Sequence, residues 1–210
     1  MKNKLYSIPS IIFPNKKINY FTFFIILLGI ISGSIFLVIL KDSDKDIVIS
    51  KISEFMSNVD SNKVNNLIAF KNAFIENSIY VVLVWILGLS IIGIVINIFI
   101  TYLRGFITGF SISSFILAYK YKGILASFIF AFPTCIINLI TTFIISVYSF
   151  TFTVMLFKSI FNKTNNLIIK GYLKKYFLIL GICMILVLLS SISEAFLLSS
   201  IMKLVVKLFI

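Results

Sequence analysis

Long apolar runs, separated by short segments rich in lysine, are the main pattern along this chain. Several runs have the roughly 20 residues that an α-helix needs to cross the hydrocarbon core of a bilayer. The pattern predicts an all-α fold, a polytopic membrane helical bundle that forms a single domain over residues 1–210. The five predicted spans are residues 20–40, 79–102, 105–119, 133–157 and 176–201.

The apolar run at residues 123–157 does not fit this scheme directly, because it is too long for one span and too short for two. Pro133 divides the run. We therefore expect residues 123–132 to form a re-entrant or surface segment and the fourth span to begin at Pro133.

Residues 41–76 have a different character, since six of the seven acidic residues of the chain lie here. Apolar residues recur at helical spacing on both sides of a turn at Ser61 and Asn62. This spacing predicts two short amphipathic helices that rest on the membrane surface or dock a partner. The docking candidates on their apolar faces are Ile52, Phe55 and Leu67.

The distribution of charge orients the predicted bundle. Residues 1–19, a predicted tight turn at Arg104 and the loop at 158–175 together hold ten basic residues and no acidic one. Because cytoplasmic loops of membrane proteins carry an excess of lysine and arginine, we expect these segments to be cytoplasmic. The acidic segment at 41–76 and the C-terminus then lie outside the cell.

Composition and motifs exclude several classes of protein. With 60% hydrophobic and 12% charged residues, the chain is not a soluble domain. Its net charge of +12 does not indicate nucleic-acid binding, because the lysines are scattered between apolar runs. The sequence has no histidine, no Walker A, GxGxxG or CxxC motif, and one acidic residue, Glu194, in the predicted spans. We therefore expect neither catalysis nor a cofactor or metal.

Small residues spaced four apart occur in two of the predicted spans, at Gly29 and Gly33 and again at Gly105 and Gly109. Such pairs let helix backbones approach closely inside a membrane. This spacing favours packing within the bundle over homodimerisation, which stays open as the alternative.

Glu194 is the acidic residue in the fifth predicted span. It lies about 27 Å from the inner boundary if the span begins near Tyr176, which is close to the outer interface. Arg104, at the predicted inner turn, is then too far away to be its partner, whereas Lys120 and Lys122 can reach toward it. The hypothesis is a tie between Glu194 and these lysines, and the alternative is a solvated carboxylate.

Residues 85–115 and the segment SISEAFLLSSIMK resemble the stage II sporulation protein M family. The motif positions that carry this resemblance are Trp85, Gly88, Ser90, Gly93, Arg104, Gly105, Gly109, Phe110, Pro133, Glu194, Ala195, Phe196, Met202 and Lys203. The polar pair that the family leads us to expect after Pro133 is Thr134-Cys135 here.

The resemblance implies a non-catalytic membrane scaffold of endospore formation. Such a protein would lie in the mother-cell membrane that engulfs the forespore. It would hold two peptidoglycan hydrolases there, a lytic transglycosylase and an amidase/endopeptidase. Two other classes stay open from the residues alone, namely a small membrane transporter or permease subunit and an intramembrane enzyme.

Overall fold

The computed structural model describes residues 15–60, 65–130, 134–162 and 166–198. This part of the chain is helical and contains no strand, and five of its helices are long and apolar enough to cross a membrane. The prediction of an all-α, multi-pass bundle is therefore confirmed. The five long helices are α2 (Lys16–Ile39), α4 (Asn66–Gly88), α5 (Gly93–Phe130), α6 (Ile136–Asn162) and α7 (Asn166–Ile192).

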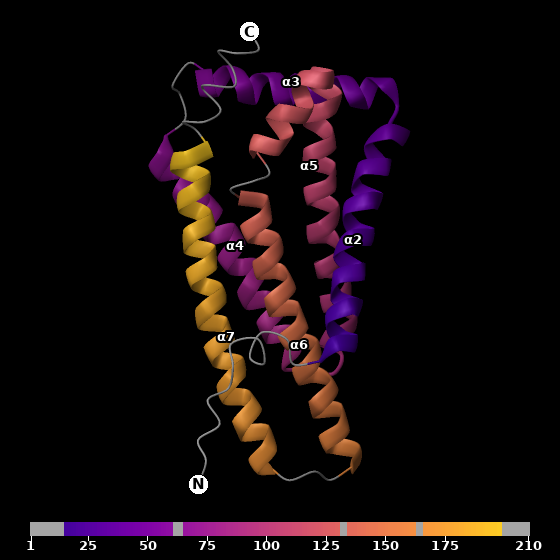
Figure 1. The fold of residues 1–210 in the computed structure, drawn as a ribbon, viewed down its shortest axis with the longest axis vertical. Helices are drawn as coiled ribbons and strands as arrows, with labels where there is room; N and C mark the ends of the chain where they lie inside the picture. The colour runs from indigo at the N-terminus through magenta and orange to yellow at the C-terminus, as the bar shows by residue number, and fades with distance from the viewer. Residues whose placement is uncertain (1–14, 61–64, 131–133, 163–165, 199–210) are drawn as a thin grey trace.

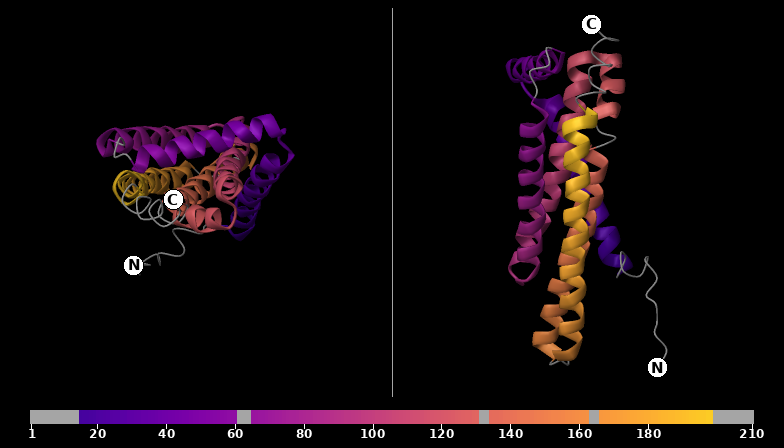
Figure 2. Two further views of the ribbon diagram at one scale, coloured as in Figure 1. Left: turned by 90° about the horizontal axis from the view of Figure 1, so that it is seen from above. Right: turned by 90° about the vertical axis from the view of Figure 1, so that its left-hand side faces the viewer.

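Two shorter elements complete the described fold. The helix α3 (Asp42–Asp60) lies across one end of the bundle, and the π-helix η2 (Ser193–Leu198) continues α7 toward that same end (Figure 1). The turn between α4 and α5 lies toward the opposite end. There α6 and α7 form a hairpin that extends beyond the other helices (Figure 2).

The pairing of α2 with α5 depends on the four glycines that the sequence singles out. A Cβ atom added at Gly29, Gly33, Gly105 or Gly109 would come within 3.0 Å of backbone atoms on the facing helix. The two backbones therefore touch, and Ser32 Oγ lies 2.7 Å from the Tyr102 hydroxyl beside them. The small-residue spacing serves packing within the chain, as its pattern favoured.

The limits of the second and third spans were predicted wrongly. Helix α4 ends at Gly88, and α5 begins at Gly93 and continues through Arg104, where the sequence suggested a turn between 79–102 and 105–119. The true break is at the two glycines, because a side chain at Gly93 would meet the carbonyl group of Leu87. A single arginine does not end a helix when its guanidinium has a hydrogen-bond partner inside the bundle.

The acidic segment 41–76 also differs from its prediction. Its first half is the amphipathic helix α3, but its second half is the beginning of α4 rather than a separate surface helix. Asn65 caps α4 by accepting hydrogen bonds from the backbone amides of Leu67 and Ile68. This cap starts the second span well before residue 79, and it places Glu76 inside the span.

The segment 123–132, expected to be re-entrant or superficial, is described as far as residue 130 and forms the last part of α5. Helix α5 changes direction before this segment, at Lys120, whose φ of 51° and ψ of −125° interrupt the helix. Pro133 lies outside the described residues. The fourth span begins at Ile136, and most of the predicted loop 158–175 belongs to the ends of α6 and α7.

The helix α3 packs on α5 through its apolar face. Met56 is 2% exposed, and the ring of Phe55 lies edge-on to Phe115 with 6.5 Å between centroids. The exposed side of α3 carries acidic residues, and Lys51, which lines a groove between α3 and α5, donates to the exposed Glu54 at 2.8 Å. That hydrogen bond lowers the pKa of the Glu54 carboxyl.

A charged cavity inside the membrane bundle

Buried hydroxyl groups line the face of α6 that packs against α4 and α5. Ser149 donates to the carbonyl oxygen of Val84 at 3.0 Å, and Thr153 donates to that of Gly88 at 2.9 Å. Thr101 and Ser146 share a hydrogen bond of 2.9 Å between α5 and α6. In a bilayer these bonds replace the hydrophobic effect as a source of helix association.

Trp85 and Gly88 belong to this packing rather than to a ligand site. The indole ring of Trp85 stacks on Tyr176 with 5.4 Å between centroids, and the Tyr176 hydroxyl donates to the Trp85 carbonyl oxygen at 2.7 Å. A Cβ atom at Gly88 would collide with Ser149 and Tyr176. These motif residues therefore join α4 to α6 and α7.

A small polar cavity lies above this packed region, toward the end of the bundle that α3 covers. Its volume is about 130 Å³, and three charged side chains line it. Four elements contribute to its wall, and the polar lining residues are Glu76, Asn77, Arg104, Thr108, Ser111, Thr134, Cys135, Asn138 and Glu194.

Arg104 supplies the positive charge of the cavity. Its guanidinium donates a hydrogen bond to the side-chain carbonyl oxygen of Asn77 and lies over the ring of Tyr80, 5.1 Å from the centroid. Asn77 is 5% exposed, and its amide nitrogen donates to the carbonyl oxygen of Ala73 at 2.8 Å. That second bond fixes the amide so that its oxygen faces the arginine.

Glu76 and Glu194 supply the negative charges, from α4 and η2. Glu194 is partly buried and interacts electrostatically with both Glu76 and Arg104. In the described part of the chain, Arg104 forms no ion pair within 4 Å with either carboxylate. The three charges therefore surround the cavity without neutralising one another by direct contact.

The backbone of the cavity wall is irregular where Glu194 and Thr134 lie. Glu194 belongs to the π-helical turn η2, and Thr134 and Cys135 form a π-type turn at the start of α6. Non-helical backbone at membrane depth is tolerated where it lines a cavity, and π-turns are frequent at functional sites. The irregular backbone and the charged side chains therefore lie around the same cavity.

The predicted partners of Glu194 were assigned wrongly in one respect. Arg104 was expected to lie too far away, but both residues line the cavity, because Arg104 is inside α5 and not at a turn. Lys120 lies at the kink of α5, and Lys122 follows it on the exposed surface. Neither lysine lines the cavity.

Sequence reasoning missed Glu76 as a site residue, because the residue was assigned to the outer loop. The signal that could have found it is Asn65, a good N-cap residue at the start of an uninterrupted helical pattern. The three docking candidates from the sequence do not lie on one surface. Ile52 and Phe55 line an apolar groove against α5, whereas Leu67 is 73% exposed on α4.

These features define a polytopic helical membrane protein that carries a charged site inside its spans. Residues 22–198 match the stage II sporulation protein M family, and the chain belongs to that family. It is therefore a sporulation-related membrane protein. Neither the curated proteins nor the solved structures include a significant match to the chain.

Proposed function

We propose that this protein is a non-catalytic membrane scaffold that localises and holds peptidoglycan hydrolases while the forespore is engulfed. The observation that carries the proposal is the family match, which extends over residues 22–198 and so includes nearly all of the five spans. The proposed partners are a lytic transglycosylase and an amidase/endopeptidase, acting from the mother-cell membrane.

The arrangement of the bundle supports the orientation that a scaffold for external enzymes needs. The beginning of α2, the α4–α5 turn and the α6–α7 hairpin lie toward one end, and α3 lies at the other (Figures 1 and 2). The first end carries Lys16, Lys17, Lys158, Lys174 and Lys175, which favours a cytoplasmic position. The acidic α3 then lies on the outer face, where wall enzymes act.

The test of this function is deletion of the protein, followed by membrane-stain microscopy of sporulating cells. We expect the engulfing membrane to stop at the septum, because the hydrolases would no longer be held where the wall must be thinned. Restoration by the wild-type chain is the control. Complete engulfment in the deletion strain, in the absence of a second copy of the gene, would contradict the proposal.

A small membrane transporter is a second candidate, and the charged cavity is the observation that favours it. Charged residues within spans often mark the path of an ion or solute. The cavity of about 130 Å³ lies within one bundle and is small for a solute pathway. If Arg104→Met abolished an ion flux through liposomes containing the purified protein, that result would favour transport over the scaffold.

A further inference from the structure

Among the charged residues that line the cavity, Glu76 is the one whose side chain lies exposed on the surface of the bundle. It lies ten residues after the first residue of α4 and twelve before the last, about 15 Å and 18 Å along the axis. Its side chain is nevertheless exposed, although the residue lies near the middle of this candidate span. An unpaired charge there costs at least about 2.5 kcal/mol, and such residues are normally paired.

The charged groups around the cavity do not balance. Helix α4 contributes the Glu76 carboxylate, η2 the Glu194 carboxylate and α5 the Arg104 guanidinium, while α6 contributes the uncharged Thr134, Cys135 and Asn138. With both acids ionised, the sum is one negative charge. In that charge state the site lacks one positive charge, and the exposed carboxylate is the place where an outside group could supply it.

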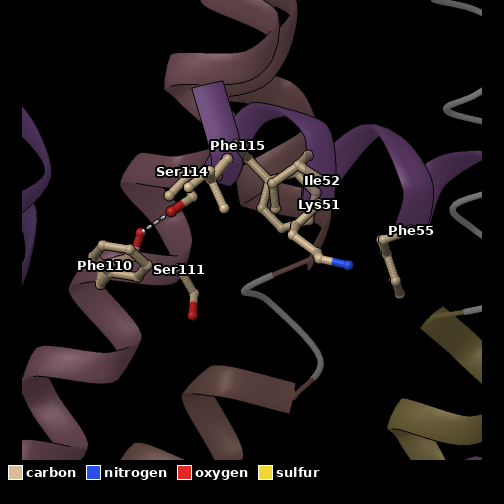
Figure 3. Close-up of a pocket in the computed structure, with 9 residues that line it drawn as sticks. Lys51, Ile52, Phe55, Phe110, Ser111, Ser114 and Phe115 are labelled. Carbon is tan, nitrogen blue, oxygen red and sulfur yellow. Dashed lines mark hydrogen bonds between the residues drawn. The ribbon is translucent and has the colours of Figure 1, made fainter. Parts of the chain in front are cut away.

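An apolar groove continues from the cavity toward the outer end. It has a volume of about 420 Å³ and lies between the apolar face of α3 and helix α5 (Figure 3). Phe55, Phe110 and Phe115 contribute rings to its lining, and Ser111 lines both the groove and the charged cavity. The two hollows therefore adjoin along one face of the molecule.

On this face, the charged cavity and the apolar groove lie one above the other along the helix axes. Helices α4 and α5 join at their turn and separate toward α3, which crosses above them (Figure 1). Phe110 and Phe115 lie six and eleven residues beyond Arg104, which is about 9 Å and 17 Å closer to the outer end of α5. The face thus offers a charge near mid-bilayer and an aromatic groove one and a half to three helical turns above it.

We propose that this face binds the transmembrane helix of a partner protein, and that this helix carries one lysine or arginine near mid-bilayer. The basic side chain pairs with Glu76 and balances the cavity, and apolar side chains six to eleven residues nearer the outer end fill the groove under α3. A phospholipid does not fit the same pattern, because its amine lies at the membrane surface. The inference rests on the scaffold function, since it names how a partner is held.

The experiment uses the full-length protein in liposomes with synthetic transmembrane peptides. Each peptide is a leucine-alanine helix of about 23 residues, with lysine, glutamine or leucine at its centre and an acceptor dye. Energy transfer from a fluorescent protein fused to the chain measures association. We expect the lysine peptide to associate at least about tenfold more tightly than the leucine peptide, which corresponds to about 1.4 kcal/mol.

Variants decide whether Glu76 and the groove are responsible. Glu76→Gln should remove the preference for lysine and leave association with the leucine peptide unchanged, which also shows that the variant is folded. Phe110→Ala should weaken association with both peptides. Asp44→Asn, in the exposed first turn of α3, is the matched control and should behave as the wild type.

Three results would overturn the inference. They are equal association of the lysine and leucine peptides, a lysine preference that survives Glu76→Gln, and association between two copies of the chain that Glu76→Gln abolishes and the lysine peptide cannot displace. The last result would assign the face to a second copy. None of these measurements contains a hydrolase, so their failure is distinguishable from failure of the scaffold function in sporulating cells.

Discussion

At the scale of single residues, the cavity shows how a charge is accommodated within an apolar span. Arg104 is held by the amide oxygen of Asn77 and the ring of Tyr80, while Glu76 and Glu194 offset its charge from two other elements. The sequence identified Arg104 and Glu194 as unusual, because both interrupt apolar runs. It did not bring them together, since that required knowing that α5 continues past Arg104.

The first residue-scale prediction concerns Arg104→Met. This change removes the positive charge, leaves the buried Asn77 oxygen without its donor and leaves two carboxylates facing one cavity, so it should lower the free energy of unfolding by about 1–3 kcal/mol. Thermal unfolding of the purified protein in detergent measures the effect. Adding Glu194→Gln to Arg104→Met should recover part of the loss, and Lys174→Met on the exposed surface of α7 should change little. Equal stability of wild type and Arg104→Met would show that the carboxylates do not depend on the arginine.

At the scale of helices, apolar runs predicted how many spans there are, because length and hydropathy are local properties. The ends of α4 and α5 could not be predicted as well. The ends are set by the Asn65 cap and by close backbone contact at Gly93. In the sequence, the charges at residues 76 and 104 looked like helix ends instead. The role of the glycine pairs was predictable, because backbone contact needs small residues at that spacing.

A matched pair of glycine substitutions tests the contact between α2 and α5. Gly109→Ala places a Cβ atom against the backbone of Ile30 and should destabilise the protein by about 1–3 kcal/mol through overpacking. Gly181→Ala has open space around its Cβ and should be neutral or gain up to about 1 kcal/mol from helix propensity. Chemical denaturation of both variants measures the difference. A Gly109→Ala variant as stable as Gly181→Ala would mean that the two helices do not touch as described.

At the scale of the whole molecule, the described residues place lysines without acidic residues at one end of the bundle, and α3 with its acidic residues at the other. The orientation assigned above predicts that a cysteine at Ser43, in α3, reacts with a membrane-impermeant maleimide in intact cells. A cysteine at Lys158, in the α6 extension, should react only after the cells are permeabilised. Both changes are made in a chain whose Cys135 and Cys183 are replaced by serine. Labelling of the Lys158 position in intact cells would reverse the orientation and remove α3 from the outer face.

The scaffold role itself depends on what accompanies this protein in sporulating cells. The most direct measurement is affinity purification of the tagged protein from cross-linked, engulfing cells, with the wall hydrolases quantified by mass spectrometry. The account predicts recovery of a lytic transglycosylase and an amidase/endopeptidase with the wild-type chain and with the Gly181→Ala control, and reduced recovery with Glu76→Gln. Recovery of neither enzyme with the wild-type chain would contradict it.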